Sequence, residues 1–432
     1  MCAIAGAFIS RFFVGFVCQR YGPRIPFAAL IVFSSIPTAL QGAVYTANQF
    51  YIVRFFVGIG GGSFVASEFW LNNMFKRELA ARVNGFSNGM GLAIALCYFF
   101  LRVVVNPLLR YASGSVEIGW RASFSIISLG SLCVGLPLIF LTDDTPRGNY
   151  SKLKKTGDIR PMPHWNCFCV CMKDKNIWIL AFQHACNLGI ELIINRVLYN
   201  YAKEQFNQNE RRCRLISLSF SFCNQFGRVV GGALIDKAYR YYGKHFKWMF
   251  LQFGPSFHSN YFTYTIYEGG KGVLQNYLVY LCLAGVFFFL FSCLSNIYVA
   301  LTILFLASFL TSYSQSATFG IVPYIHPELN GVVSGIIGSA GALGGIILGF
   351  VFREQSFKHA FQTTGSLFII ASFLTRFFFI PDYASLYFNE DCSEKDELKI
   401  VQSETNDTKS SSDDSSSYTM SPRASNIDEL DL

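Results

Sequence analysis

The sequence predicts an all-α polytopic membrane protein made of two helical bundles. Its 432 residues are 52% hydrophobic and 14% charged, whereas soluble domains are about 25% charged. Eleven apolar stretches approach the roughly 20 residues that a bilayer-spanning helix needs. An arginine pattern within the first stretch recurs in the second half of the chain, which indicates two related halves.

Five predicted spans precede a long polar stretch and six follow it. In chain order the first five cover approximately residues 1–19, 25–46, 49–71, 83–105 and 119–142. The last six cover approximately residues 177–200, 212–236, 277–296, 298–320, 331–352 and 362–380. We therefore expect an N-terminal bundle over 1–142, a central loop over 143–176 and a C-terminal bundle over 177–381.

The arginine pattern aligns the first span with the second span of the later half. One helix is therefore expected to be missing at the N-terminus of an arrangement of twelve. A truncated gene prediction is the simplest explanation, and a functional eleven-helix protein is the alternative.

The central loop, 143–176, is expected in the cytoplasm because its basic residues outnumber its acidic ones. The basic residues are Arg147, Lys152, Lys154, Lys155, Arg160, Lys173 and Lys175. The acidic residues are Asp143, Asp144, Asp158 and Asp174.

Two further segments depart from the helical pattern. Residues 254–276 are polar and rich in glycine and aromatics, so we interpret them as an insertion in the C-terminal bundle or as translated noncoding sequence. Residues 382–432 are rich in Ser, Asp and Glu and predict a disordered cytoplasmic tail. Serines of that tail are candidate substrates of kinases, and a simple solvated linker is the alternative.

The recurring pattern contains two arginines inside apolar sequence. Arg11 stands four residues before Gly15, and Arg228 stands four residues before Gly232. In both places a Gln or Asp and then a basic residue follow the glycine. An arginine at the centre of a membrane helix costs roughly 2.5–3.5 kcal/mol on insertion scales, so its presence there indicates a function.

The depth of the two arginines favours a binding site. Arg11 precedes the basic membrane edge at Arg20 by nine positions, as Arg228 precedes Lys237. At 1.5 Å per residue both lie about 13 Å inside a core of about 30 Å. A side chain this deep reaches the interface poorly, although snorkelling is the alternative interpretation. The planar guanidinium suits a small planar oxyanion, so the pair predicts an anion site between the halves.

Glycines recur at spacings of three to four in one helix of each half. In the first half Gly89 follows Gly85 by four positions, with Gly91 close behind; in the second half the glycines are Gly338, Gly341, Gly344 and the adjacent Gly345. Such spacing lets helices approach closely. Each glycine alone is explained by tight packing, but the repeat predicts helix-packing or gating surfaces of a rocking transporter.

Other charges inside predicted spans have several interpretations. Glu191 and Arg196 lie five apart on one helix, and they predict either a proton-coupling carboxyl or a structural ion pair. Arg54 and Glu68 are expected near the two ends of one span, where each faces the membrane interface or has a structural role. His184 is expected to be a packing histidine with its ring nitrogens satisfied.

Several classes of function are not supported. The sequence lacks a G-x-S-x-G elbow, an H-E-x-x-H motif and paired carboxylates in a plausible cleft, so we expect no enzyme, no metal site and no cofactor. The net charge of +8 is spread over loops between spans, so nucleic acid is not an expected partner. The 13 cysteines are scattered and predict no disulfide framework.

The stretch from Gly15 to Arg24, GFVCQRYGPR, resembles the G-x-x-x-D-R-x-G-x-R loop of the major facilitator superfamily, with Gln19 in place of the acidic residue. The matching loop residues are Gly15, Arg20, Gly22 and Arg24. Further stretches are similar to the nitrate/nitrite porter branch of that superfamily. They are YIVRFFVG (51–58), WRA (120–122), DDTPRGNY (143–150), LGIEL (188–192) and ATFGIVP (317–323).

The resemblance implies twelve helices, alternating access and, for eukaryotic members, proton-coupled import. It implies that Arg11 and Arg228 hold nitrate between the halves. The family signature G-W-G-N-x-G-G-G departs here, because Leu92 and Ala342 stand where its asparagines would be. That departure weakens the case for nitrate, whereas the two arginines preserve the case for an anion.

The expected function is transport of nitrate or nitrite across a membrane, with the plasma membrane as the expected location. The expected partners are a small inorganic anion, protons and the lipid bilayer. One alternative is a transporter of another small anion, such as a monocarboxylate, phosphate or sulfate. The other is a non-transporting nitrate sensor or degenerate paralogue.

Overall fold

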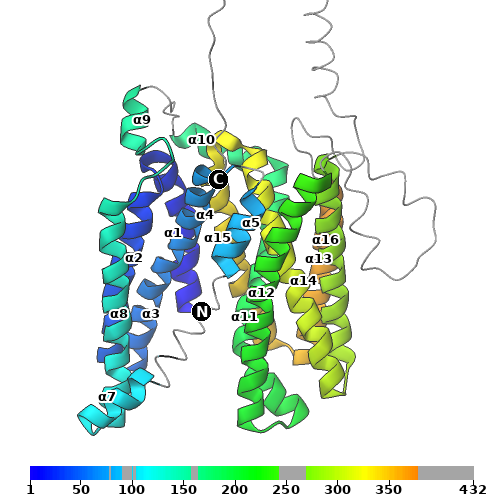
Figure 1. The fold of residues 1–432 in the computed structure, drawn as a ribbon. Helices are drawn as coiled ribbons and strands as arrows, with labels where there is room; N and C mark the ends of the chain where they lie inside the picture. Colours follow the sequence, from blue (N-terminus) through cyan, green and yellow to red (C-terminus); the bar gives the residue numbers. More distant parts are fainter. Residues whose placement is uncertain (77–78, 90–99, 101–103, 157–163, 243–268, 378–432) are drawn as a thin grey trace, which may run out of the picture. The chain divides into compact units, whose positions relative to one another are not determined.

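The computed structural model describes residues 1–76, 79–89, 100, 104–156, 164–242 and 269–377, and these are almost entirely helical (Figure 1). They belong to one compact unit, Met1–Phe388. A second unit, Asn389–Leu432, lies outside the described residues, as does the tail predicted over 382–432.

The first half of the chain forms seven described α-helices. They are α1 (Cys2–Tyr21), α2 (Arg24–Leu40), α3 (Ala47–Ile59), α4 (Ser63–Met74), α5 (Ala80–Gly89), α7 (Asn106–Ser113) and α8 (Val116–Leu141). Short 3-10 turns, η1 (Gln41–Ala43) and η2 (Gly60–Gly62), extend α2 and join α3 to α4. Local sequence explains the ends: Thr46 and Gln49 form a capping box that starts α3, and Gly22, with φ of 86°, ends α1.

Two helices of the central loop and six of the second half follow. They are α9 (Tyr150–Thr156), α10 (His164–Lys173), α11 (Lys175–Phe206), α12 (Glu210–Tyr242), α13 (Gly269–Cys293), α14 (Ile297–Ile325), α15 (Asn330–Glu354) and α16 (Phe357–Leu374), with the turns η5 (Pro327–Leu329) and η6 (Thr375–Phe377). Side chains cap three helices: Asp174 starts α11, Asn296 starts α14 and Ser356 starts α16.

Seven helical stretches of the described chain are long and apolar enough to cross a membrane. They are Cys2–Tyr21, Arg24–Ala43, Ala47–Met74, Val116–Leu141, Lys175–Phe206, Ile297–Pro323 and Asn330–Glu354. Each coincides with a predicted span. Predicted spans 212–236, 277–296 and 362–380 coincide with α12, α13 and α16. The described parts of these three helices are not both long and apolar enough to be counted among the seven. Predicted span 83–105 is described mainly through α5 and lies mostly outside the described residues.

The interpretation of 254–276 as one insertion is corrected at its end. Residues 254–268 lie outside the described residues, but Gly269 already begins α13, eight positions before the predicted span at 277. Hydropathy marks the part of a helix that crosses the apolar core and not its polar ends, so it placed this start too late.

The helices pack as two bundles that meet along a few helices (Figure 1). Within the first bundle α2 packs on α8 and α1 on α3; within the second, α11 packs on α15, α13 on α16 and α12 on α14. Between the bundles α1 packs on α15, and α5 packs on α12 and α14. The exact bundle boundaries stay predictions.

Glycines permit the closest approach between the bundles. A Cβ on Gly15 would lie 2.5 Å from the carbonyl oxygen of Gly331 and 2.9 Å from the Cα of Gly335. A Cβ on Gly232 of α12 would collide with the carbonyl oxygen of Ala81 of α5. Small residues let the helix backbones touch here, as they do in membrane proteins generally.

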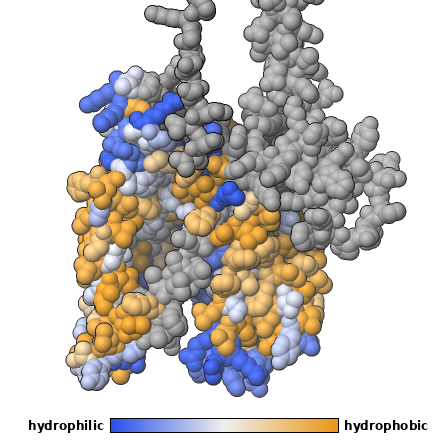
Figure 2. Space-filling view, viewed as in Figure 1, coloured by the Kyte–Doolittle hydropathy of each residue, from blue (hydrophilic) through white to orange (hydrophobic). Residues whose placement is uncertain are grey.

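The outward faces of both bundles are apolar. Figure 2 shows hydrophobic residues over the sides of the helices and hydrophilic residues concentrated near their ends. Large apolar side chains such as Phe13, Leu129 and Phe140 are 60%, 62% and 81% exposed. Faces of this kind would aggregate in water, and lipid is the solvent in which they are stable.

A buried carboxylate fastens the central loop to the first bundle. Asp144 is 2% exposed, and its two oxygens accept from the backbone N–H groups of Arg24 and Tyr150, both at 3.0 Å. The guanidinium of Arg24 donates to the carbonyl of Thr142 at 2.8 Å. Burial raises the pKa of the Tyr150 phenol to about 12, so that side chain stays neutral.

Replacing Asp144 by alanine is expected to lower the thermal stability of the protein. Two buried N–H groups would lose their acceptors, and each loss costs about 1–3 kcal/mol. The matched control is Asp143→Ala, because the Asp143 side chain is exposed and its hydrogen bond to Trp70 uses the backbone carbonyl. Melting of the detergent-purified proteins measures the difference; equal melting temperatures for the two variants would contradict this account.

Candidate functional site

Arg228 lies in α12 at the centre of a buried polar network. Its side chain is buried, and its Nη2 donates to a carboxylate oxygen of Glu191 in α11 and to the amide oxygen of Gln315 in α14. The amide nitrogen of Gln315 donates to the same Glu191 oxygen at 3.0 Å. Three helices of the second bundle therefore hold one guanidinium in place.

The network continues into the first bundle through α5. The Nη1 of Arg228 donates to the backbone carbonyl of Asn88 at 3.4 Å, and the side-chain amide of Asn88 donates to Glu68 in α4. Within the described part of the chain, the buried Nε of Arg228 has no acceptor. A buried guanidinium donor without an acceptor is costly unless a ligand supplies one.

Arg11 reaches the same region from α1. Its Nε donates to the carbonyl of Gly61 and its Nη1 to the carbonyl of Gly338, both at 3.1 Å. Its guanidinium lies 4.8 Å above the ring of Phe64. Each arginine thus reaches across to the other bundle: Arg11 of α1 donates to Gly338 of α15, and Arg228 of α12 donates to Asn88 of α5.

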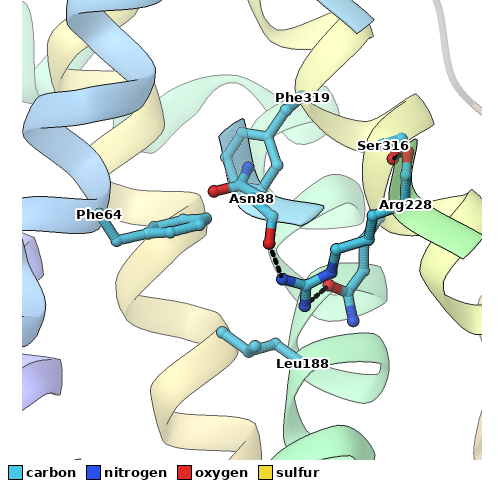
Figure 3. A pocket seen from close by; sticks show the side chains of 7 residues that line it. Phe64, Asn88, Leu188, Arg228, Ser316 and Phe319 are labelled. Atoms are coloured by element: carbon cyan, nitrogen blue, oxygen red, sulfur yellow. Dashed lines mark hydrogen bonds between the residues drawn. The ribbon is translucent and has the colours of Figure 1, made fainter. Parts of the chain in front are cut away.

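A small pocket lies beside Arg228. Its lining residues are Phe64, Asn88, Leu188, Arg228, Gln315, Ser316 and Phe319. Figure 3 shows Phe64 approaching from the first bundle and Arg228 from the second, with Phe319 beside Asn88. The rings of Phe64 and Phe319 meet edge to face, with their centroids 5.3 Å apart. The pocket thus combines aromatic walls with a charged donor, Arg228, a composition that suits a small anion with flat faces.

The predicted alternative of an ion pair between Glu191 and Arg196 is wrong. Arg196 is exposed, and the described carboxylate partner of Arg228 is Glu191. Residues five apart on an α-helix differ by about 500° of rotation and point to different sides. The buried cation on another helix therefore becomes the partner of Glu191.

The glycines of α15 lie against several helices. A Cβ on Gly338 would lie 2.8 Å from Val65 of α4, and the Gly338 carbonyl accepts from Arg11. Cβ atoms on Gly341, Gly344 and Gly345 would meet His184, Ala185 and Leu192 of α11. In the first half, Gly89 is the last residue of α5, and Gly91 lies outside the described residues.

The C-terminal end of α1, which carries the first part of the motif Gly15–Arg24, connects the two bundles. The amide nitrogen of Gln19 donates to the carbonyl of Glu328 at 2.5 Å, and its oxygen accepts from the N–H of Gly331 at 3.0 Å. Arg20 is exposed, and its backbone carbonyl accepts from Lys154. Gln19 thus makes two hydrogen bonds across the interface that one acidic side chain could not, since it lacks a donor.

Sequence reasoning did not identify Gln315 or Asn88 as site residues. The signal for Gln315 was the run of polar residues from Thr311 to Thr318 inside an apolar span, because polar residues at that depth mark functional surfaces. The description of His184 as satisfied is wrong for the described chain. Its ring packs 5.0 Å from Phe319, but neither ring nitrogen has a hydrogen-bond partner there.

The fold and this polar centre define a polytopic helical membrane protein with two bundles around a central charged pocket. The chain belongs to the Major Facilitator Superfamily, whose family model matches residues 1–267. That superfamily consists of membrane transporters and not of enzymes, which confirms the expectations of a multi-pass membrane protein without enzymatic activity.

Curated relatives support the resemblance to the nitrate/nitrite porter branch. The chain is 28% identical to high-affinity nitrate transporter 2.3 of Oryza sativa subsp. japonica, over 81% of this chain and 63% of that one. It is 25% identical to high affinity nitrate transporter 2.5 of Arabidopsis thaliana, over 82% and 65%. With the nitrate/nitrite transporter NrtP of Nostoc punctiforme the identity is 22%, over 88% and 83%. The chain thus spans less than two thirds of the length of the two plant relatives.

Solved structures share the fold. The human organic anion transporter MFSD10 (TETRAN) superimposes with a TM-score of 0.59 at 14% identity, over 87% of this chain and 82% of that one. The E. coli fucose:proton symporter FucP gives 0.57 at 14% identity, over 87% and 88%. At this identity the likeness establishes the helical architecture alone.

Proposed function

We propose that this protein transports nitrate or nitrite across a membrane by alternating access, with the anion held between Arg11 and Arg228. The observation that carries the proposal is a pair of arginines from opposite bundles beside one aromatic-walled pocket: Arg228 lines the pocket, and the half-buried Arg11 lies over Phe64, one of its walls. A bound anion offsets their mutual repulsion, so it stabilises the arrangement in which the bundles are together.

The donors suit a trigonal oxyanion. An oxygen of the anion accepts the Nε–H of Arg228 that has no described acceptor, and a second oxygen accepts from Arg11, whose Nη2 has no hydrogen bond to the described chain. The rings of Phe64 and Phe319 exclude water from the planar faces of the ion. The names of the curated relatives favour nitrate and nitrite among anions of this shape.

The proposal includes uptake of a proton with the anion and a location in the plasma membrane. Buried carboxyl groups beside the pocket support the first part, because a transporter that uses a proton gradient needs a group that can bind and release a proton inside the membrane. The apolar outer faces support a bilayer location of some kind, and expression of a tagged protein identifies which membrane it is.

The test is uptake of labelled nitrate into liposomes that contain the purified full chain. We expect saturable uptake, competition by unlabelled nitrite, and at least tenfold weaker competition by sulfate, phosphate and acetate. Sulfate and phosphate are tetrahedral and not planar, and acetate carries an apolar methyl group. A small pocket that suits a planar ion fits neither shape. Equal competition by all of these anions, or an absence of nitrate flux, would contradict the proposal.

A further inference from the structure

We propose that Glu68 is the residue that carries the proton taken up with the anion. This assignment rests on the proposed function. It differs from the expectation formed from the sequence, which pointed to Glu191, because the structure gives Glu191 and Glu68 different partners.

Glu68 has the geometry of a reversible proton site. It lies in α4, is 1% exposed and accepts one hydrogen bond, from the amide of Asn88 to its Oε1. Its Oε2 is buried and has no hydrogen-bond partner within the described chain. A carboxyl buried in this way, with no ion pair of its own, is costly when ionised and stable when it carries a proton.

A short chain of contacts joins this carboxyl to the anion pocket. Asn88 donates to Glu68 through its side chain and accepts from Arg228 through its backbone carbonyl. Asn88 also lines the pocket. The charge on Glu68 is therefore one residue away from the guanidinium that would bind the anion.

The balance of charge around the pocket explains why the anion and the proton would be taken up together. The half-buried Arg11, the buried Arg228 and the two buried carboxylates, Glu68 and Glu191, sum to zero charge when all four are ionised. A bound nitrate ion would leave one uncompensated negative charge in a medium where such a charge costs several kcal/mol. One proton on Glu68 removes that cost.

The other titratable groups nearby are less suited to this role. Glu191 already serves as the acceptor of both Arg228 and Gln315. His184 is 1% exposed and its ring nitrogens have no hydrogen-bond partner in the described chain, so nothing there would offset the positive charge of a further proton.

Charged groups also lie on the helices that pack against α4. In the described chain they are Arg11 and Arg20 on α1, Arg24 on α2, Arg82 on α5, and Arg353 and Glu354 on α15. Arg11 and Arg24 donate to backbone carbonyls, and Arg228 is the charge that acts on Glu68 most directly. Because Arg228 is neutralised by Glu191 and then by the anion, it stabilises the Glu68 carboxylate least when the anion is bound.

The linkage has a definite sign. The protein binds the anion more tightly when Glu68 is neutral. By reciprocity, the bound anion favours the protonated form of Glu68. A proton from the outer solution binds Oε2 and is released on the cytoplasmic side when the anion leaves. With one proton per anion, a gradient of one pH unit accumulates nitrate about tenfold inside.

The experiment compares the full-length wild type with Glu68→Gln in liposomes, and Gln keeps the acceptor for Asn88. Two fluxes are measured: exchange of labelled for unlabelled nitrate at equal pH, and accumulation driven by an inward gradient of one pH unit. We expect both proteins to exchange, but only the wild type to accumulate nitrate about tenfold. Glu210→Gln, an exposed residue paired with Arg214, is the matched control and is expected to accumulate like the wild type.

Each outcome separates the two proposals. Accumulation of about tenfold by Glu68→Gln would overturn the assignment of Glu68 and leave the proposed function intact. Failure of the wild type to exchange nitrate would overturn the proposed function and with it this inference. Binding to purified protein gives a second readout: nitrate affinity is expected to fall as pH rises in the wild type and to be independent of pH in Glu68→Gln.

Discussion

Arg228→Lys is expected to bind nitrate roughly 10–100-fold more weakly than the wild type, since a charged hydrogen bond contributes about 1.5–3 kcal/mol and 1.4 kcal/mol is a factor of ten. The guanidinium donates to Glu191, Gln315 and Asn88, and its buried Nε–H has no acceptor in the described chain. An ammonium group on a flexible stem keeps the charge but cannot make these contacts and also present a donor to the anion.

Lysine is the informative substitution because alanine would change more than the site. Removing the cation would leave Glu191 buried without its partner, which costs about 3–5 kcal/mol and threatens folding. Arg54→Lys is the matched control: Arg54 is exposed in α3 and lies over the ring of Phe50. It is expected to bind nitrate as the wild type does.

Binding is measured by titration calorimetry on detergent-purified protein, together with uptake into liposomes. The same substitution at Arg11 is expected to weaken binding by a similar factor, because its Nη1 and Nε are fixed by two carbonyls. Wild-type affinity in both lysine variants would show that planar two-point recognition by these arginines is not how the anion binds.

The sequence was sufficient to predict the helical fold, most spans and the two arginines. Those features follow from local composition: an apolar stretch of span length must be a helix in lipid, and an arginine within it must have a reason to be there. The resemblance was carried by short motifs in a fixed order, and the family match confirmed it.

The partners of the charges could not be predicted, because they depend on helix rotation and packing between distant segments. Glu191 forms its ion pair with Arg228, 37 positions away, and not with Arg196 on its own helix. Glu68 of α4 accepts from Asn88 of α5, a contact that the sequence did not predict and that supports the role proposed for Glu68. Hydropathy alone also could not place the first residue of α13, since polar helix ends look like loops.

Gly15→Leu is expected to reduce nitrate uptake roughly tenfold to a hundredfold while leaving a folded protein. A Cβ at this position would lie 2.5 Å from the carbonyl oxygen of Gly331, and no flexible side chain stands there to move aside. The leucine must therefore separate α1 from α15, at a cost of about 1–3 kcal/mol for overpacking. That cost falls on the arrangement in which the bundles touch and not on each bundle by itself.

The contact at Gly15 matters for transport because it lies next to the two hydrogen bonds of Gln19 that join the bundles. Alternating access requires such a contact to form and break in every cycle, so a wedge that prevents its formation stops turnover. Gly130→Leu is the matched control, because nothing lies within 4 Å of a Cβ on Gly130 of α8. Liposome uptake and melting temperature are measured for both variants. Normal uptake by Gly15→Leu would mean that the close approach of α1 and α15 is not part of the transport cycle.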